Sequence, residues 1–183
     1  MMKKKICHDM SPAIEKVFME AFPENERRPM EWLRRLLKEE PAMHLCTYDD
    51  KAMLCYWQFA TFVYVEYLAV DKSLRGQGMG GRIIRQLAES VDVPVVLEVE
   101  PPVDELTKRR VAFYQRHGFQ LLTYPYEQPS YGVVPGMPLR LMLCVRDEKM
   151  HVPSAEEMSA TIHERVYGVK SDKQACEMCK NGE

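Results

Sequence analysis

Residues 63–87 read VYVEYLAVDKSLRGQGMGGRIIRQL, and this stretch decides the fold. Its first part, residues 63–70, is mostly β-branched, aromatic and apolar, which is typical of a strand. A polar break follows, and four glycines then fall within residues 76–81. From Met79 onward, apolar residues recur at helical spacing. The stretch therefore predicts a strand, a glycine-rich turn and a helix.

A glycine-rich turn that leads into a helix is typical of an anion site. Glycine permits positive φ and lets a ligand approach the backbone without a Cβ atom in the way. The first N–H groups of a helix lack partners within it, and the helix dipole places partial positive charge there. Arg75 adds a formal charge and a forked donor at the turn. We therefore expect a phosphate site, rather than a helix that merely begins with glycines.

Two kinds of nucleotide site compete for this turn. Gly76, Gly78 and Gly81 satisfy the dinucleotide spacing G-x-G-x-x-G, with Glu98 downstream. In that motif the first glycine follows the strand at once, whereas residues 71–75 intervene here. The chain beyond the turn is also too short for the βαβ repeats of such domains. The sequence thus argues against a dinucleotide-binding domain.

A second family fits better. Residues 75–80 (RGQGMG) follow a strand that ends at residues 68–70 (LAV), and this R-x-x-G-x-G pattern resembles the pyrophosphate loop of the GNAT superfamily of N-acyltransferases. Downstream, residues 113–119 (FYQRHGF) resemble the aromatic-Tyr-x-x-x-Gly-Phe signature of the same family. Both motifs occur in the family's order, with a predicted strand between them. The resemblance covers roughly residues 5–145.

This resemblance implies a fold and a cosubstrate. The implied fold is mixed α/β, with a mostly antiparallel central sheet flanked by helices and one parallel, splayed strand pair that forms an acetyl-CoA cleft. Strand backbone groups would hold the pantetheine arm, and the turn would hold the pyrophosphate. The residues implied to bind acetyl-CoA are Leu68, Ala69, Val70, Arg75, Gly76, Gln77, Gly78, Met79, Gly80 and Gly81.

Tyr114 is the first implied catalytic residue. It matches the family tyrosine whose hydroxyl acts as a general acid near the thioester sulfur, and the alternative is a plain core tyrosine. One position departs from the family pattern. Many members have an asparagine about two helical turns before this tyrosine, and Thr107 stands there in this chain.

Glu66 is the second implied catalytic residue. A carboxylate in an otherwise apolar strand is costly unless it has a role or a partner. Strand alternation places it on the same sheet face as Leu68. It resembles the acidic residue that several members use as base. An ion pair with an arginine, such as Arg82 or Arg110, is an equal alternative, and Glu98 on the neighbouring strand is the second candidate base.

Apolar periodicity and chain breakers place the other elements. The helical crossover predicts that residues 95–99 run parallel to residues 63–70. Residues 124–138 are expected to form a long loop, and Trp32 is expected to point inward. The remaining elements are strands over 4–8, 43–48, 51–60, 119–124 and 139–145 and helices over 12–22, 30–40, 104–117 and 154–168. We expect one acetyltransferase domain over residues 1–147, followed by a C-terminal helix and tail over 148–183.

Composition limits the classes of partner. The formal net charge is −2, which gives no reason to expect nucleic-acid or anionic membrane binding. No apolar run follows the basic residues 3–5, and none is long enough to span a bilayer, so we expect a cytoplasmic protein. Cys176 and Cys179 form a lone C-x-x-C in a polar tail, and no metal site is expected there.

The predicted function is transfer of an acetyl group from acetyl-CoA to an amine, by direct attack in a ternary complex. The alternative is a non-catalytic acyl-CoA-binding or sensing module on the same fold. Two variable segments are expected to border the acceptor: the connector 23–29, with Glu24, Glu26 and Arg27, and the loop 124–138, with Tyr124, Tyr126 and Tyr131. The sequence favours a small-molecule amine over a protein acceptor, and it leaves a homodimer open.

Overall fold

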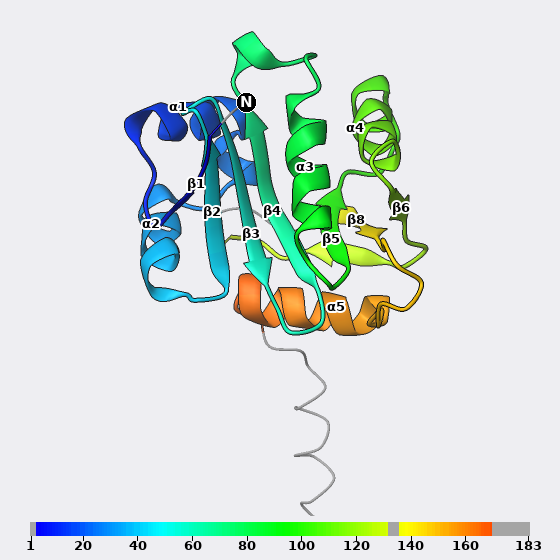
Figure 1. Cartoon of the computed structure of the whole chain (residues 1–183). Helices are drawn as coiled ribbons and strands as arrows, with labels where there is room; N and C mark the ends of the chain where they lie inside the picture. Colours follow the sequence, from blue (N-terminus) through cyan, green and yellow to red (C-terminus); the bar gives the residue numbers. More distant parts are fainter. Residues whose placement is uncertain (1–2, 132–135, 170–183) are drawn as a thin grey trace, which may run out of the picture.

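The computed structural model describes residues 3–131 and 136–169. The strands form one eight-stranded sheet in the order β1-β2-β3-β4-β5-β8-β6, and β7 also pairs with β8 (Figure 1). The strands are β1 (Lys4–Cys7), β2 (Met43–Tyr48), β3 (Ala52–Gln58), β4 (Val63–Val70), β5 (Val95–Val99), β6 (Phe119–Leu121), β7 (Tyr126–Gln128) and β8 (Met137–Cys144). The α-helices are α1 (Pro12–Ala21), α2 (Met30–Glu39), α3 (Met79–Glu89), α4 (Glu105–Gln115) and α5 (Ala155–Thr161).

Strands β4 and β5 form the parallel pair, and the other strand pairs in the described chain are antiparallel. The parallel register runs from Val63 opposite Val95 to Val65 opposite Leu97 and stops there. Strand β4 nevertheless continues to Val70 on its β3 side. The predicted fold class, with its parallel pair, is confirmed, and the two strands part beyond Val65.

Two apolar cores lie on opposite faces of the sheet. Helices α1, α2 and α5 cover one face, which we call the α1 face; Phe18, Leu33 and Ile162 are buried there. Helices α3 and α4 cover the other, the α3 face, with Ile84 and Val111 buried. Figure 1 shows α3 alongside β4 and β5, with α4 beyond it. Because β4 and β5 are central, their gap lies between two well-packed layers.

The region after α4 differs from the prediction. Strand β6 ends at Leu121, β8 begins at Met137, and the expected loop contains β7. Strand β7 is a three-residue strand whose Tyr126 pairs with Leu139. Such a short strand in a segment rich in proline and polar residues carries no period-2 apolar signal. The remainder of that loop, residues 132–135, lies outside the described residues.

The C-terminal helix packs on the same chain. Ser154 and Glu157 form the expected capping box, and a π-helical turn over Ile162–Val166 extends α5. Met158, Ile162 and Val166 are buried in the core of the α1 face. This apolar contact explains why the helix lies across the sheet. The tail beyond residue 169, with Cys176 and Cys179, lies outside the described residues.

Trp32 was expected to point inward, and this expectation is wrong. Its side chain is 45% exposed, whereas Leu33 and Leu37 on the same helix are buried. The apolar stripe of α2 is therefore narrower than composition suggested. Among the described helices, none is both long and apolar enough to cross a membrane.

Candidate active site

A cavity of about 790 Å³ opens where β4 and β5 part. From the α3 face it is lined by the glycine turn and by Tyr114 of α4. From the α1 face it is lined by Glu66, Glu98 and Tyr131. The cavity thus reaches both faces of the sheet through the strand gap. We call the part beside the turn the turn end, and the part beside the two carboxylates the carboxylate end.

The turn end is built by the backbone. Gly76 and Gly78 adopt φ of 76° and 73°, which L side chains rarely adopt, so glycine is required at both positions. Gly78 is the N-cap of α3 and supplies no side-chain cap. The first N–H groups of the helix therefore receive no side-chain cap from this residue, and such helix starts favour anions. Arg75 closes the turn by donating from Nε to the Val70 carbonyl oxygen at 3.0 Å.

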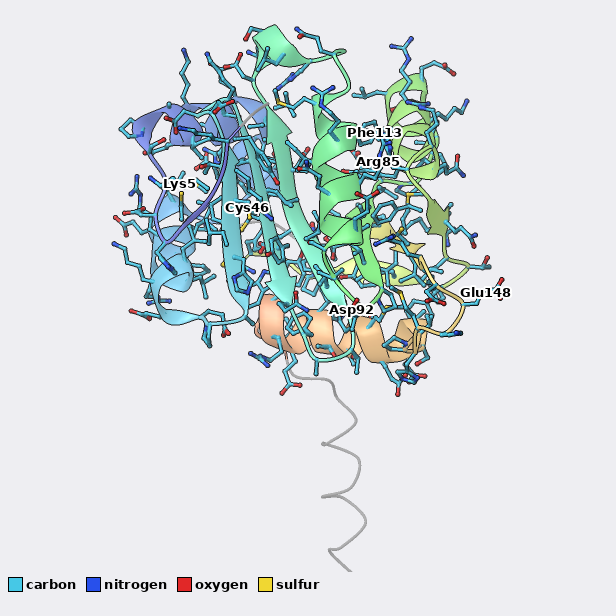
Figure 2. The ribbon with its side chains drawn as sticks, in the orientation of Figure 1. Lys5, Cys46, Arg85, Asp92, Phe113 and Glu148 are labelled. Atoms are coloured by element: carbon cyan, nitrogen blue, oxygen red, sulfur yellow. The ribbon has the colours of Figure 1, made fainter. Side chains whose placement is uncertain are left out.

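Eight of the ten residues expected to bind the cosubstrate line this cavity; Gln77 and Gly81 do not. Gln77 donates from Nε2 to the Ser73 carbonyl oxygen at 2.9 Å and so braces the turn. A Cβ on Gly81 would lie 2.3 Å from His117 Nε2, so this glycine serves helix packing. Gly80 lies beside Phe113, which projects from α4 toward α3 (Figure 2).

Tyr114 lies on the α3 face of the cavity. Its ring makes edge contacts with Phe113 and Phe119, at centroid distances of 5.0 and 5.7 Å. Burial raises the pKa of Tyr114 to about 12, although Arg110 opposes the shift. The hydroxyl therefore keeps its proton at neutral pH and is available as a donor.

Thr107 stands at the position of the family asparagine, but its polar groups form hydrogen bonds with Asp104. Its backbone N–H donates to Asp104 Oδ1 at 2.8 Å, and its hydroxyl accepts from the Asp104 N–H at 3.1 Å. The pair is the capping box of α4. Thr107 is buried and does not line the cavity.

A β-bulge reverses the expected orientation of Glu66. Cys55 pairs with Tyr67 and Tyr56 pairs with Val65, so Glu66 is an extra residue without a partner on β3. Its side chain consequently lies on the α1 face with Tyr67. Leu68 and Val70 pack on the α3 face, so the expectation from strict alternation is wrong.

Glu66 forms an ion pair, but with neither expected arginine. Arg28 Nε donates to Glu66 Oε1 at 2.7 Å, and both side chains are almost wholly buried. Trp57 Nε1 and the Tyr131 hydroxyl also donate to Glu66, at 2.6 and 2.9 Å. Arg110 pairs instead with Glu100. Arg82 donates to the Gln77 carbonyl oxygen.

Arg28 was not identified from the sequence. Its guanidinium lies 4.7 Å from the ring centroid of Tyr131 and 5.9 Å from those of Trp57 and Tyr167. Burial alone would lower the pKa of Arg28, but the neighbouring Glu66 carboxylate outweighs burial and the net shift is upward. The side chain therefore stays charged. An arginine in a charged connector between two prolines gives no local signal of burial.

Glu98 occupies a different environment. Three neutral groups donate to its Oε2: Tyr64 Oη at 2.9 Å, Tyr167 Oη at 2.9 Å and Gln128 Nε2 at 2.6 Å. Tyr126 donates to Oε1. No lysine or arginine within residues 3–131 and 136–169 pairs with Glu98. Burial raises the pKa of Glu98 above its ordinary value of 4.5, although the four hydrogen bonds oppose the shift.

Only some of the residues expected to border an acceptor line the cavity. Glu26 and Tyr131 line the cavity, whereas Glu24 does not. Arg27 donates to the Phe22 carbonyl oxygen at 3.1 Å. Tyr124 packs against the core of the α1 face. The connector thus lines the cavity with Glu26. Its Arg28 contacts the cavity indirectly, through the ion pair with Glu66.

Comparison with known proteins agrees with this geometry. The family model described as "Acetyltransferase (GNAT) domain" matches residues 42–121. A solved Bacteroides thetaiotaomicron protein, provisionally assigned as a GNAT-family acetyltransferase, is 38% identical with a TM-score of 0.78. That match covers 86% of this chain and 91% of the other.

Two further proteins resemble this chain, one over part of its sequence and one in its fold. The Bacillus subtilis (strain 168) protein YjbC, which carries a provisional acetyltransferase name, is 38% identical over 104 residues. That match covers 55% of this chain and about half, 53%, of YjbC. The Salmonella typhimurium protein yncA, solved with acetyl-CoA, has a TM-score of 0.59 at 15% identity, covering 85% and 99% of the two chains. With 38% identity across most of the Bacteroides protein and a matching fold, this chain belongs to the GNAT family.

Proposed function

We propose that the protein transfers an acetyl group from acetyl-CoA to an amine by direct attack within one ternary complex. The observation that carries the proposal is a cavity at the strand gap, with the glycine turn and the start of α3 at one end and buried carboxylates at the other. The relative yncA was solved with acetyl-CoA, which supports this cosubstrate.

The residues of the turn end suit this cosubstrate. The uncapped N–H groups of α3 and the charge of Arg75 would hold the pyrophosphate. Within the described chain, the β5-facing edge of residues 66–70 has no strand partner beyond Val65, so it is available to pair with an extended amide-containing arm. One of these N–H groups would stabilise the thioester oxygen as it gains charge.

The transfer step needs one acid and one base. The amine nitrogen attacks the thioester carbonyl carbon, the C–N bond forms and the C–S bond breaks. Tyr114 would give its proton to the leaving thiolate, and a carboxylate would take the proton lost by the amine. Tyr114 lines the cavity from the α3 face and the carboxylates line it from the α1 face, as these two roles require.

Glu66 and Glu98 remain the two candidates for the base, and we favour Glu98. A proton that reached Glu66 would disrupt its buried ion pair with Arg28. Within the described residues the partners of Glu98 are neutral, and burial raises its pKa, which is the direction that favours a proton acceptor. Glu66 would then hold the wall of the cavity in place through Arg28.

Replacing the favoured base gives a test with a defined sign. Glu98→Gln should lower turnover about 100-fold and remove the acidic limb of the pH–rate profile. That limb should lie above pH 4.5 in the wild type, because protonation of Glu98 at its raised pKa abolishes the base. Glu66→Gln should retain the limb. If instead Glu66→Gln removes the limb and Glu98→Gln keeps it, the two roles are exchanged.

Replacing Gly78 tests the anion site. Gly78→Val should weaken acetyl-CoA binding about tenfold or more in calorimetric titration, because a strained N-cap misplaces donors to a charged group. Gly168→Val is a matched control. Gly168 has φ of 72°, no described atom outside its chain neighbours lies within 4 Å of where its Cβ would be, and it does not line the cavity, so the substitution adds the same backbone strain outside the glycine turn. Equal affinity in the two variants would argue against phosphate binding at this turn.

Acetyl transfer itself is tested with a panel of primary amines. Release of free CoA thiol should depend on the amine and match N-acetylated product one to one by mass spectrometry. Binding of acetyl-CoA without thiol release for any amine would instead support a non-catalytic acyl-CoA-binding module on this fold.

A further inference from the structure

Tyr167 follows the last helical turn of the described chain and lies beyond the family match at residues 42–121. It is placed by buried contacts: Ile162 and Val166 pack into the core of the α1 face, which also holds Tyr64. The Tyr167 N–H donates to the Ile162 carbonyl oxygen at 3.3 Å and closes the π-helical turn. The residue therefore has a fixed position against the sheet.

The hydroxyl of Tyr167 lies within the polar group around Glu98. It donates to Glu98 Oε2 at 2.9 Å and accepts from Gln128 Nε2 at 2.8 Å. The hydroxyls of Tyr64 and Tyr131 lie 3.2 and 3.4 Å away. Side chains from β4, from β5, from β7 and from Tyr131 thus meet at this one oxygen.

Residues 166 and 167 are also linked to Glu66, through Tyr131 and Arg28. Tyr131 donates to Glu66 Oε1 at 2.9 Å, so Tyr131 stands between Tyr167 and the Arg28–Glu66 pair. Arg28 Nη2 donates to the carbonyl oxygen of Val166. Residues 166 and 167 therefore contact the partners of both carboxylates that line the carboxylate end.

We propose that Tyr167 is a positioning residue that holds the Glu98 carboxylate at the carboxylate end of the cavity. The segment after the last strand thereby supports a carboxylate that the sheet contributes to the cavity. The inference deepens the proposed function, because it rests on Glu98 acting as the base in acetyl transfer. The placement of Glu98 by Tyr167 is measurable without any transfer assay.

The titration of Glu98 depends on every group that faces it. These groups are Tyr64 and Glu66 from β4, Tyr126 and Gln128 from β7, Tyr131, Tyr167, and Arg28 behind Glu66, with His163 packed on the Tyr126 ring. A hydroxyl that donates to a carboxylate favours its charged form and lowers its pKa. Removing the Tyr167 hydroxyl should therefore raise the pKa of Glu98, while the ring keeps its place.

The test is a carbon-detected NMR titration of side-chain carboxyls in the full chain, with the Glu98 signal assigned by its loss in Glu98→Gln. In Tyr167→Phe the midpoint of Glu98 should rise by about one pH unit, the size expected for one lost hydrogen bond to a charged group. Tyr48→Phe is the matched control, since Tyr48 is buried in β2 and does not line the cavity. An unchanged midpoint in Tyr167→Phe would overturn the inference.

A kinetic comparison separates positioning from general structural support. In Tyr167→Phe the acidic limb of the transfer profile should move to higher pH by the same amount, and the plateau rate should recover above it. A rate that falls equally at all pH values would overturn the positioning role. If the wild type transfers no acetyl group while the Glu98 midpoint still moves, the proposed function fails and the placement of Glu98 by Tyr167 stands.

Discussion

Tyr114→Phe should lower acetyl transfer by at least about 100-fold while leaving acetyl-CoA affinity within about twofold. The hydroxyl is the only group removed, and the ring retains its edge contacts with Phe113 and Phe119. With the pKa of Tyr114 raised to about 12, the wild-type hydroxyl stays protonated across the working pH range. Its loss therefore removes a proton donor and leaves the cavity shape intact.

The measurement is single-turnover transfer at saturating acetyl-CoA, with affinity determined separately by calorimetry. Tyr48→Phe is the control, because it removes a buried hydroxyl from the same face of the sheet. A Tyr114→Phe protein that turns over at the wild-type rate would show that the leaving thiolate needs no acid from α4. Loss of affinity with unchanged chemistry would instead assign Tyr114 to binding.

Arg28→Met should lower the free energy of unfolding by about 3–5 kcal/mol, the usual cost of leaving one partner of a buried ion pair alone. Arg28 is 5% exposed, and its loss leaves the buried Glu66 carboxylate without a counter-charge. It also removes the donor to the Val166 carbonyl oxygen and the cation held among Trp57, Tyr131 and Tyr167. Urea unfolding at constant pH measures the change.

The control for this prediction is Arg34→Met, which breaks partly exposed pairs with Asp9 and Glu15 and should cost about 1 kcal/mol or less per pair. The double variant Arg28→Met with Glu66→Gln should regain part of the lost stability, because the isolated carboxylate is also removed. If the two single changes were simply additive, the buried pair would contribute no coupling, contrary to its 2.7 Å contact.

Local signals made the turn end predictable. Strand composition, clustered glycines and a helical stripe are contiguous in residues 63–87, and the structure places β4, the turn and α3 there. The parallel pair was predicted both from the resemblance and from the helical crossover. A helix between two neighbouring strands of one sheet returns the chain so that both strands run in the same direction. The capping boxes of α4 and α5 are equally local, although Thr107 was considered in the sequence only as a departure from the family asparagine.

The carboxylate end was less predictable because it depends on pairs of distant segments. The bulge at Glu66 exists only in the register between β3 and β4, and no pattern within β4 marks it. Arg28 meets Glu66 across 38 residues, and Tyr167 meets Glu98 across 69. Both carboxylates were predicted because they interrupt apolar strands, but nothing in either strand indicates which distant residues form hydrogen bonds with them.

The most direct test of the account is a calorimetric titration of the wild-type protein with acetyl-CoA, with NAD titrated in parallel. This measurement does not depend on the acceptor. We expect one equivalent of acetyl-CoA bound per chain and no heat with NAD. Binding of NAD, or no binding of acetyl-CoA, would contradict the role assigned to the glycine turn and to the cavity between β4 and β5.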